Sequence, residues 1–93
     1  MTPLEKTMRA VPITMYGRDS SDCTRARTWL ASGGYTFKER NVDADPTAQA
    51  SWKKIAPDGV VPAFDVEGQT FAGFDPDRIR AALSYSAARR LQR

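Results

Sequence analysis

Hydrophobic and polar residues follow two different periods along this 93-residue chain, and the changes of period predict its strands and helices. Four segments rich in β-branched and aromatic residues predict strands. These segments comprise residues 11–16, 35–42, 60–66 and 69–72. Three segments with apolar residues at helical spacing predict helices that begin near Ser20, Asp45 and Asp75.

The predicted helices carry recognisable start and stop signals. Ser20 is a favourable N-cap, and Asp22 adds negative charge to the first turn of the same helix. Gly33-Gly34 ends this helix, because glycine accepts the left-handed conformation of a C-cap. Pro46 suits the first turn of the second helix, which Pro57-Asp58-Gly59 ends.

The order of elements is therefore β-α-β-α-β-β-α, which predicts an α/β fold. A helix between the first two strands implies a right-handed crossover and parallel pairing. The tight turn Glu67-Gly68 makes the last two strands an antiparallel hairpin. We expect a four-stranded mixed sheet flanked by helices over residues 10–84. Residues 1–9 are expected to be a flexible arm, and residues 85–93 a basic C-terminal helix extension or tail.

Length and composition limit the class of protein. Ninety-three residues suffice for one domain, and 41% apolar with 27% charged residues is ordinary globular usage. No apolar stretch is long enough to span a bilayer, and residues 1–9 lack the apolar core of a secretory signal. One cysteine cannot form an internal disulfide. We therefore expect a cytoplasmic monomer without membrane contact.

Charge and the absence of histidine exclude further chemistries. No Ser-His-Asp or Cys-His triad and no histidine-ligated metal site can form. Of the net charge of +3, most of the clustering falls in residues 77–93, with five arginines and one aspartate. This run is interpreted as a solvated helix face, although it could touch an acidic partner. Tyr85 is the only aromatic residue among these arginines, so nucleic-acid binding is not expected.

The cysteine, Cys23, stands at an informative place. It follows the first predicted strand and a short polar loop, and it lies in the first turn of the next helix. Thiol-disulfide enzymes expose a reactive sulfur in this way, because a helix N-terminus favours the thiolate. Those enzymes usually carry C-x-x-C, whereas this chain carries S-x-x-C from Ser20 to Cys23.

Three separated motifs follow one another along the chain, namely residues 16–18 with 23–27, then Val61-Pro62, then residues 71–79. In this order they resemble the glutaredoxin family of the thioredoxin fold, and especially the small redoxins that reduce ribonucleotide reductase. Tyr16-Gly17-Arg18 followed by Cys23-Thr24-Arg25-Ala26-Arg27 resembles an active-site loop in which C-x-x-C precedes x-R-A-K. Val61-Pro62 resembles the Val-Pro whose proline is cis in this fold. Residues 71–79 are similar to the S-G-F-R-P-D segment of the small redoxins. The resemblance covers residues 10–84.

The resemblance implies thiol-disulfide exchange in cell redox homeostasis, with no bound cofactor. Ser20 occupies the position of the nucleophilic cysteine and Cys23 that of the resolving cysteine. Glutathione could serve as co-substrate, and a protein disulfide or a reductase could be the partner. An iron–sulfur cluster or another metal is not expected, since the family ligand would be the residue that Ser20 replaces.

The resemblance also implies a set of glutathione-binding residues. These are Arg18, Val61, Pro62, Gly73, Phe74 and Asp75. The arginine would lie near a glutathione carboxylate, the valine backbone would pair with its cysteine part, and the proline would shape the pocket. The last three would hold the γ-glutamyl end through backbone N–H groups at a helix N-terminus, which is a natural anion site.

Two departures from the family pattern bear on the chemistry. The loop from Tyr16 to Cys23 is one residue shorter than usual, and Ser21 replaces a proline. A serine hydroxyl is not a redox nucleophile and has no histidine to activate it. Ser20 is therefore expected to cap the helix by accepting the backbone N–H of Cys23. Cys23 itself is either a reactive thiol or an inert buried residue.

Three readings remain open from the sequence. In the first, the protein is an oxidoreductase that exchanges thiols at Cys23. In the second, it is a redox-inactive module that binds glutathione, a γ-glutamyl peptide or a protein partner. In the third, Ser20 is an engineered replacement for cysteine.

Overall fold

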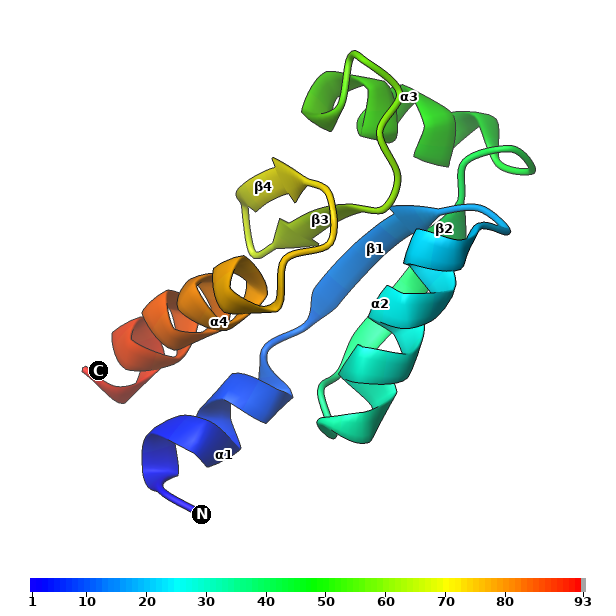
Figure 1. The fold of residues 1–93 in the computed structure, drawn as a ribbon. Helices are drawn as coiled ribbons and strands as arrows, with labels where there is room; N and C mark the ends of the chain where they lie inside the picture. The colour runs from blue at the N-terminus through cyan, green and yellow to red at the C-terminus, as the bar shows by residue number, and fades with distance from the viewer. Residues whose placement is uncertain (93) are drawn as a thin grey trace.

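In the computed structural model, which describes residues 1–92, four strands form one mixed sheet in the order β2-β1-β3-β4 (Figure 1). The strands are Ile13–Gly17 (β1), Phe37–Asn41 (β2), Ala63–Val66 (β3) and Gln69–Ala72 (β4). β1 is parallel to β2 and antiparallel to β3, and β3 and β4 form an antiparallel hairpin. The predicted α/β class, mixed sheet and strand pairing are confirmed.

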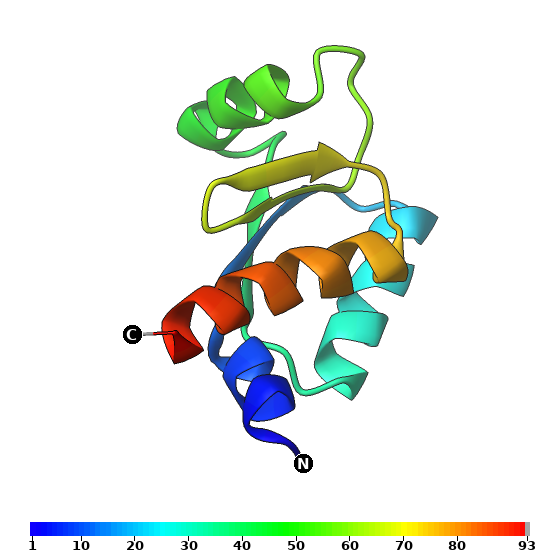
Figure 2. The same ribbon diagram turned by 90° about the vertical axis from the view of Figure 1, so that its left-hand side faces the viewer.

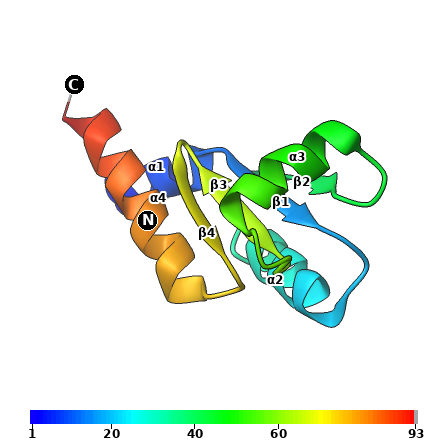
Figure 3. The same cartoon turned by 90° about the horizontal axis from the view of Figure 1, so that it is seen from above.

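Helices cover both faces of this sheet. They are Pro3–Ala10 (α1), Ser21–Ser32 (α2), Pro46–Ile55 (α3) and Pro76–Leu91 (α4). Figure 2 shows α4 running along the β3–β4 hairpin, and Figure 3 shows α2 and α3 on opposite sides of the sheet. Within residues 1–92, no helix combines the length and the apolar character that a membrane crossing requires.

Each face of the sheet has its own apolar core. Phe64 and Phe71 pack beneath α4, where α2 contributes Leu30 and α1 contributes Met8. On the other face, Trp52 of α3 packs against Tyr16, and its indole N–H donates to the carbonyl of Val60 at 2.8 Å. The apolar stripes predicted for these helices therefore face the sheet, as the helical spacing indicated.

The N-terminal segment corrects one expectation. Residues 1–9 were expected to be a flexible arm, but residues 3–10 form α1, whose N-cap Thr2 accepts the backbone N–H of Glu5 at 3.1 Å. α1 packs against α4, and Met8 is only 2% exposed. A helix of eight residues is only marginally stable in isolation and depends on such packing. The local pattern of apolar and polar residues therefore does not predict α1.

The segment after residue 84 takes one of the two predicted forms, a helix extension. α4 continues past residue 84 to Leu91, and Ser86 and Ala87 are buried against the rest of the fold. Residues 85–91 are therefore a continuation of α4, while Arg93 lies outside the described residues.

Three strands begin later than predicted, each for a local reason. The N–H of Val11 bonds to the carbonyl of Met8 and closes α1, so β1 begins only at Ile13. The N–H of Tyr35 bonds to the carbonyl of Leu30 and closes α2. Residues 60–62 form a loop before β3, because Pro62 has no N–H to donate to a ladder.

Candidate functional site

Helix α2 begins at the serine of the S-x-x-C motif. Ser20 is the N-cap, and its hydroxyl oxygen accepts the backbone N–H of Cys23 at 3.2 Å. Its carbonyl oxygen accepts both the backbone N–H and the hydroxyl of Thr24, each at 3.0 Å. The predicted capping role of Ser20 is confirmed, and the hydroxyl satisfies a donor that the helix itself leaves unpaired.

Cys23 lies under the surface. Its exposed fraction is 0%, and it is a free cysteine. The sulfur lies close to β1 at Gly17, where an added Cβ would come within 2.9 Å of Sγ. Glycine at position 17 therefore allows the first turn of α2 to approach the end of β1. Between the two readings left open for Cys23, the geometry favours the inert buried residue.

An ion pair flanks this buried sulfur. Arg27 donates two hydrogen bonds to the carboxylate of Glu39, at 2.7 and 2.6 Å. These bonds raise the pKa of the Arg27 guanidinium above its ordinary value. Glu39 Oε2 also lies 3.5 Å from the position that a Cβ of Gly17 would take. Arg27 is thus engaged with β2, where it joins α2 to the sheet.

Arg18 is held against α3. Its guanidinium donates to both carboxylate oxygens of Asp43, at 3.1 and 3.0 Å, and lies 5.2 Å from the ring centre of Trp52. The charge expected to meet a glutathione carboxylate therefore already faces a carboxylate of this chain. A ligand would have to share Arg18 with Asp43 or displace it.

The Val61–Pro62 peptide bond is cis, as the resemblance implied. Pro62 is buried, and its carbonyl accepts the backbone N–H of Gly73 at 2.7 Å. Gly73 has a φ of 90°, a conformation that favours glycine. Its hydrogen bond to Pro62 connects the segment before α4 to the cis-proline loop. Val61 is half-buried, and none of the hydrogen bonds found in residues 1–92 uses its backbone groups.

The side chain of Asp75 already binds the free backbone N–H groups at the N-terminus of α4. Its Oδ1 accepts the backbone N–H groups of Asp77 and Arg78, at 3.1 and 3.4 Å. The resemblance placed an external anion at this helix end, but the chain supplies its own carboxylate there. Asp75 is thus the N-cap of α4, and its second carboxylate oxygen has no partner among residues 1–92.

Phe74, which lies just before α4, packs against α2. Its ring meets Trp29 edge-on with ring centres 6.1 Å apart, and the guanidinium of Arg25 lies 5.8 Å from its centre. A shallow groove of about 500 Å³ runs along this contact. Its lining includes Thr24, Thr28 and Ser32, which follow one another at helical spacing on α2. None of these three was among the predicted binding residues.

The structure thus brings most, but not all, of the predicted site residues together. Gly73 bonds to Pro62, and its neighbour Phe74 packs on α2, so the second and third motifs meet the helix of the first. Arg18 instead contacts α3. Within residues 1–92, no group of three or more histidine, cysteine, aspartate or glutamate side chains is placed to hold a metal ion.

Comparison with known proteins identifies the fold. No family model and no curated protein matches this sequence. The structure is similar to that of the glutaredoxin-like protein NrdH-redoxin from Escherichia coli, with a TM-score of 0.64 and 27% identity over 75% of this chain and 92% of that one. It is also similar to glutaredoxin grx-1 from Archaeoglobus fulgidus, with a TM-score of 0.66 and 16% identity over 78% and 86% of the two chains. A buckwheat glutaredoxin–glutathione complex matches with a TM-score of 0.64 and 14% identity over 92% and 90%. The chain therefore has the thioredoxin fold in its glutaredoxin-like form.

Proposed function

We propose that this glutaredoxin-like chain is a redox-inactive binding module for glutathione or a γ-glutamyl peptide. The observation that carries the proposal is the burial of Cys23, whose exposed fraction is 0%. Thiol-disulfide exchange requires a thiolate that can approach the sulfur of an incoming disulfide. The helix start that would present such a thiolate instead presents the Ser20 hydroxyl, which caps the helix.

The surroundings of Ser20 supply no substitute for the thiol. A serine hydroxyl needs a general base to become nucleophilic, and the chain contains no histidine. Asp22, the carboxylate of the same helical turn, pairs with Arg25 at 3.2 Å. We therefore infer that the site retains the shape of a glutaredoxin site without its exchange chemistry.

Two features support binding of a γ-glutamyl ligand. Val61 carries backbone donor and acceptor groups that no hydrogen bond within residues 1–92 uses, and these could pair with an extended peptide. The second carboxylate oxygen of Asp75 could accept a hydrogen bond from the ammonium group of a γ-glutamyl end. The similarity to a glutaredoxin that was solved with glutathione is consistent with both features.

Intact mass spectrometry tests the redox part of the proposal. The folded protein is incubated with glutathione disulfide for hours, and a denatured sample serves as the control. We expect no adduct on the folded protein and one glutathione on Cys23 in the denatured sample. Rapid uptake by the folded protein, reversed by reduced glutathione, would show that Cys23 exchanges thiols and that the protein is an oxidoreductase.

Amide NMR with reduced glutathione tests the binding part. We expect shifts at Val61 and Gly73. The matched variant is Asp75→Asn, because asparagine keeps the helix cap and removes the charge. It should weaken binding without altering the free energy of unfolding by more than about 0.5 kcal/mol. If glutathione shifts no amide near the cis-proline loop, the binding proposal fails even where the redox result stands.

A further inference from the structure

Two arginines of α4 stand apart from the other arginines of the chain. Residues 1–92 contain nine arginines, and seven of them form ion pairs with carboxylates. The two without an acidic partner among the described residues are Arg78 and Arg89. Both are exposed and both lie on α4, so this helix carries uncompensated positive charge.

Aromatic rings hold these two guanidinium groups in place. Arg78 lies 5.0 Å from the ring centre of Phe71, and Arg89 lies 5.6 Å from that of Tyr85. Tyr85 is a large side chain that is 56% exposed. A cation over an aromatic face is attracted by the ring, so the charges are positioned before any partner arrives.

A groove between β4 and α4 contains both arginines. It consists of two hollows that share Gln69 and Tyr85, one of about 290 Å³ beside Arg78 and one of about 520 Å³ beside Arg89. The side-chain amide of Gln69 donates to the carbonyl of Ala82 at 2.9 Å and to the hydroxyl of Ser86 at 3.1 Å. These bonds fix β4 to α4, and the groove is therefore part of the folded structure.

The outer edge of β4 is one wall of this groove. β4 is the last strand of the sheet, and Figure 2 shows its outer side uncovered. The two-residue turn of Glu67 and Gly68 has φ values of 52° and 93°, as expected for the tight turns that connect hairpins. Val66 and Gln69 then form a hydrogen-bonded pair, so Thr70 and Ala72 direct their backbone N–H and C=O groups away from β3.

We propose that this groove binds an acidic segment of a partner protein, which adds to the edge of β4 as an extended strand. Unpaired edge groups bind strands through main-chain hydrogen bonds, and neighbouring side chains select the sequence. Arg78 and Arg89 lie about 16 Å apart along α4, at about 1.5 Å per residue. An extended strand covers this distance in about five residues. Successive side chains of a strand point to opposite faces, so acidic residues four or six positions apart share a face and would meet both arginines. An apolar residue between them on the same face would contact Tyr85.

Fluorescence anisotropy with the full chain tests the charge requirement. The probe is a fluorescein-labelled peptide of about ten residues, in which glutamates four positions apart share one face with a valine midway between them, and threonine fills the other face. Its control is the analogue with lysine in place of glutamate. The variant Arg78→Glu/Arg89→Glu should weaken binding by about tenfold or more, because two attractions become repulsions. The matched variant Lys6→Glu/Lys38→Glu changes the same charge on exposed residues of α1 and β2. It should change the affinity by less than about twofold.

A second pair of variants tests the edge of β4. Thr70→Pro removes an N–H that points away from β3, so the hairpin is retained while the incoming strand loses a donor. Thr70→Ala removes only the side chain. We expect Thr70→Pro to abolish peptide binding and Thr70→Ala to retain it, with circular dichroism and the melting temperature confirming that both variants fold. In the unchanged protein, the peptide should shift the amide resonances of Thr70 and Ala72.

Three results would overturn the proposal. The first is equal binding by the reversed-charge variant and its control, or by the two Thr70 variants. The second is tighter binding of a ten-nucleotide oligothymidylate than of the acidic peptide, which would make the groove a nucleic-acid site. The third is self-association in sedimentation that Thr70→Pro prevents, which would make a second copy of the chain the occupant of the edge.

Discussion

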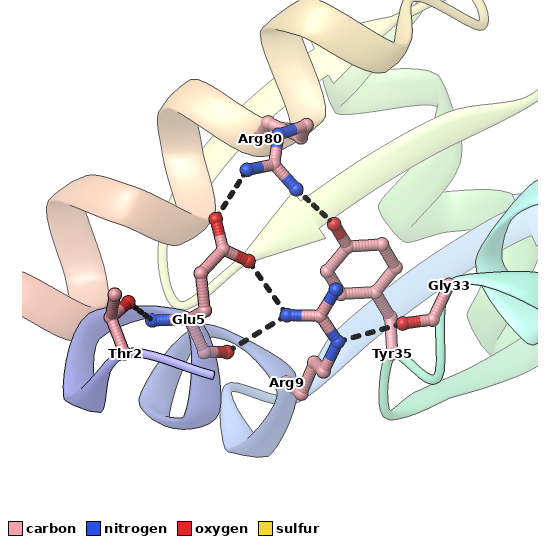
Figure 4. A network of polar contacts seen from close by, with 6 residues as sticks. All are labelled: Thr2, Glu5, Arg9, Gly33, Tyr35 and Arg80. Carbon is pink, nitrogen blue, oxygen red and sulfur yellow. Dashed lines mark hydrogen bonds and ion pairs between the residues drawn. The ribbon is translucent and has the colours of Figure 1, made fainter.

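The two ends of β1 differ in the polar groups that surround them. After its C-terminal end, α2 begins with a single side-chain cap, the Ser20 hydroxyl, and the Cys23 sulfur is buried. Before its N-terminal end, a network of ionic groups holds α1. Glu5 accepts hydrogen bonds from Arg9 and Arg80, each at 2.6 Å (Figure 4). Arg80 also donates to the hydroxyl of Tyr35, and Arg9 donates to the carbonyl of Gly33 at 2.8 Å. The network thus joins α1 to α4 and to the turn after α2.

The polar groups of the two regions therefore have different roles. Partly exposed ion pairs contribute little free energy individually, so the network chiefly fixes the position of α1. At the candidate site, by contrast, Ser20 and Asp75 serve as helix caps, and Arg18 pairs with Asp43. The site therefore keeps the geometry of the thioredoxin fold, while the Ser20 hydroxyl, the Arg18 guanidinium and one carboxylate oxygen of Asp75 are engaged within the chain.

Restoring a thiol at the helix start should have the largest effect. Ser20→Cys creates C-x-x-C and places a sulfur where a helix N-terminus favours the thiolate. We expect the rate of reduction of a glutathione mixed disulfide to rise by several orders of magnitude over the parent. Ser21→Cys, which adds a thiol one residue further on, is the control. Equal rates for the two variants would mean that a thiol at position 20 is no better placed for thiol-disulfide exchange than a thiol at position 21.

The second largest effect is expected from removing the buried Met8 side chain, which packs beneath α1. Met8→Ala should lower the free energy of unfolding by about 2–5 kcal/mol, because it leaves a cavity at a residue that is 2% exposed. Urea denaturation measures the loss. Leu4→Ala, on the exposed side of the same helix, should cost less than about 1 kcal/mol. Similar losses in both variants would show that packing against α4 does not hold α1.

The approach of α2 to β1 gives a third test. Gly17→Ala should cost about 1–3 kcal/mol, since its Cβ would come within 2.9 Å of the Cys23 sulfur. In a Cys23→Ala background the same change should cost less, because the sulfur is gone. A double-mutant cycle from urea unfolding measures this coupling. A coupling energy of zero would mean that the added Cβ is not opposed by the Cys23 sulfur.

The smallest expected effect is the pH dependence of the α1 network. Hydrogen bonds from Arg9 and Arg80 lower the pKa of Glu5 in the folded state below its ordinary value of 4.5. The stabilisation by this carboxylate is therefore present above pH 4.5 and is lost as the pH falls through the lowered pKa.

Comparing the unchanged protein with Glu5→Gln isolates this contribution. The difference in melting temperature between them should be constant near neutral pH and should shrink under acidic conditions. Asp45, whose pKa is also lowered, is present in both proteins, so its effect cancels. A difference that is independent of pH down to pH 2 would exclude Glu5 as the source.

The amino-acid sequence by itself determined the elements whose signals are local. Ser20 caps the helix that it was predicted to cap, and Asp45 and Asp75 cap helices that were predicted to begin near them, because a cap needs only a side chain within three residues of its donor. The bounds of β4 and both modes of strand pairing also follow from turn residues and element order. The three family motifs identified the fold through residues that are close in sequence within each motif.

Tertiary structure alone decided the features that join distant residues. α1 forms because Met8 enters a core to which β1, β3, β4, α2 and α4 also contribute, and one apolar residue in the sequence does not predict that packing. Arg18 meets Asp43 twenty-five positions away, and Arg80 meets Glu5 seventy-five positions away. The burial of Cys23 likewise depends on how closely α2 approaches Gly17 of β1. Whether a cysteine is reactive is set by such solvent access, which a helix start in the sequence does not determine.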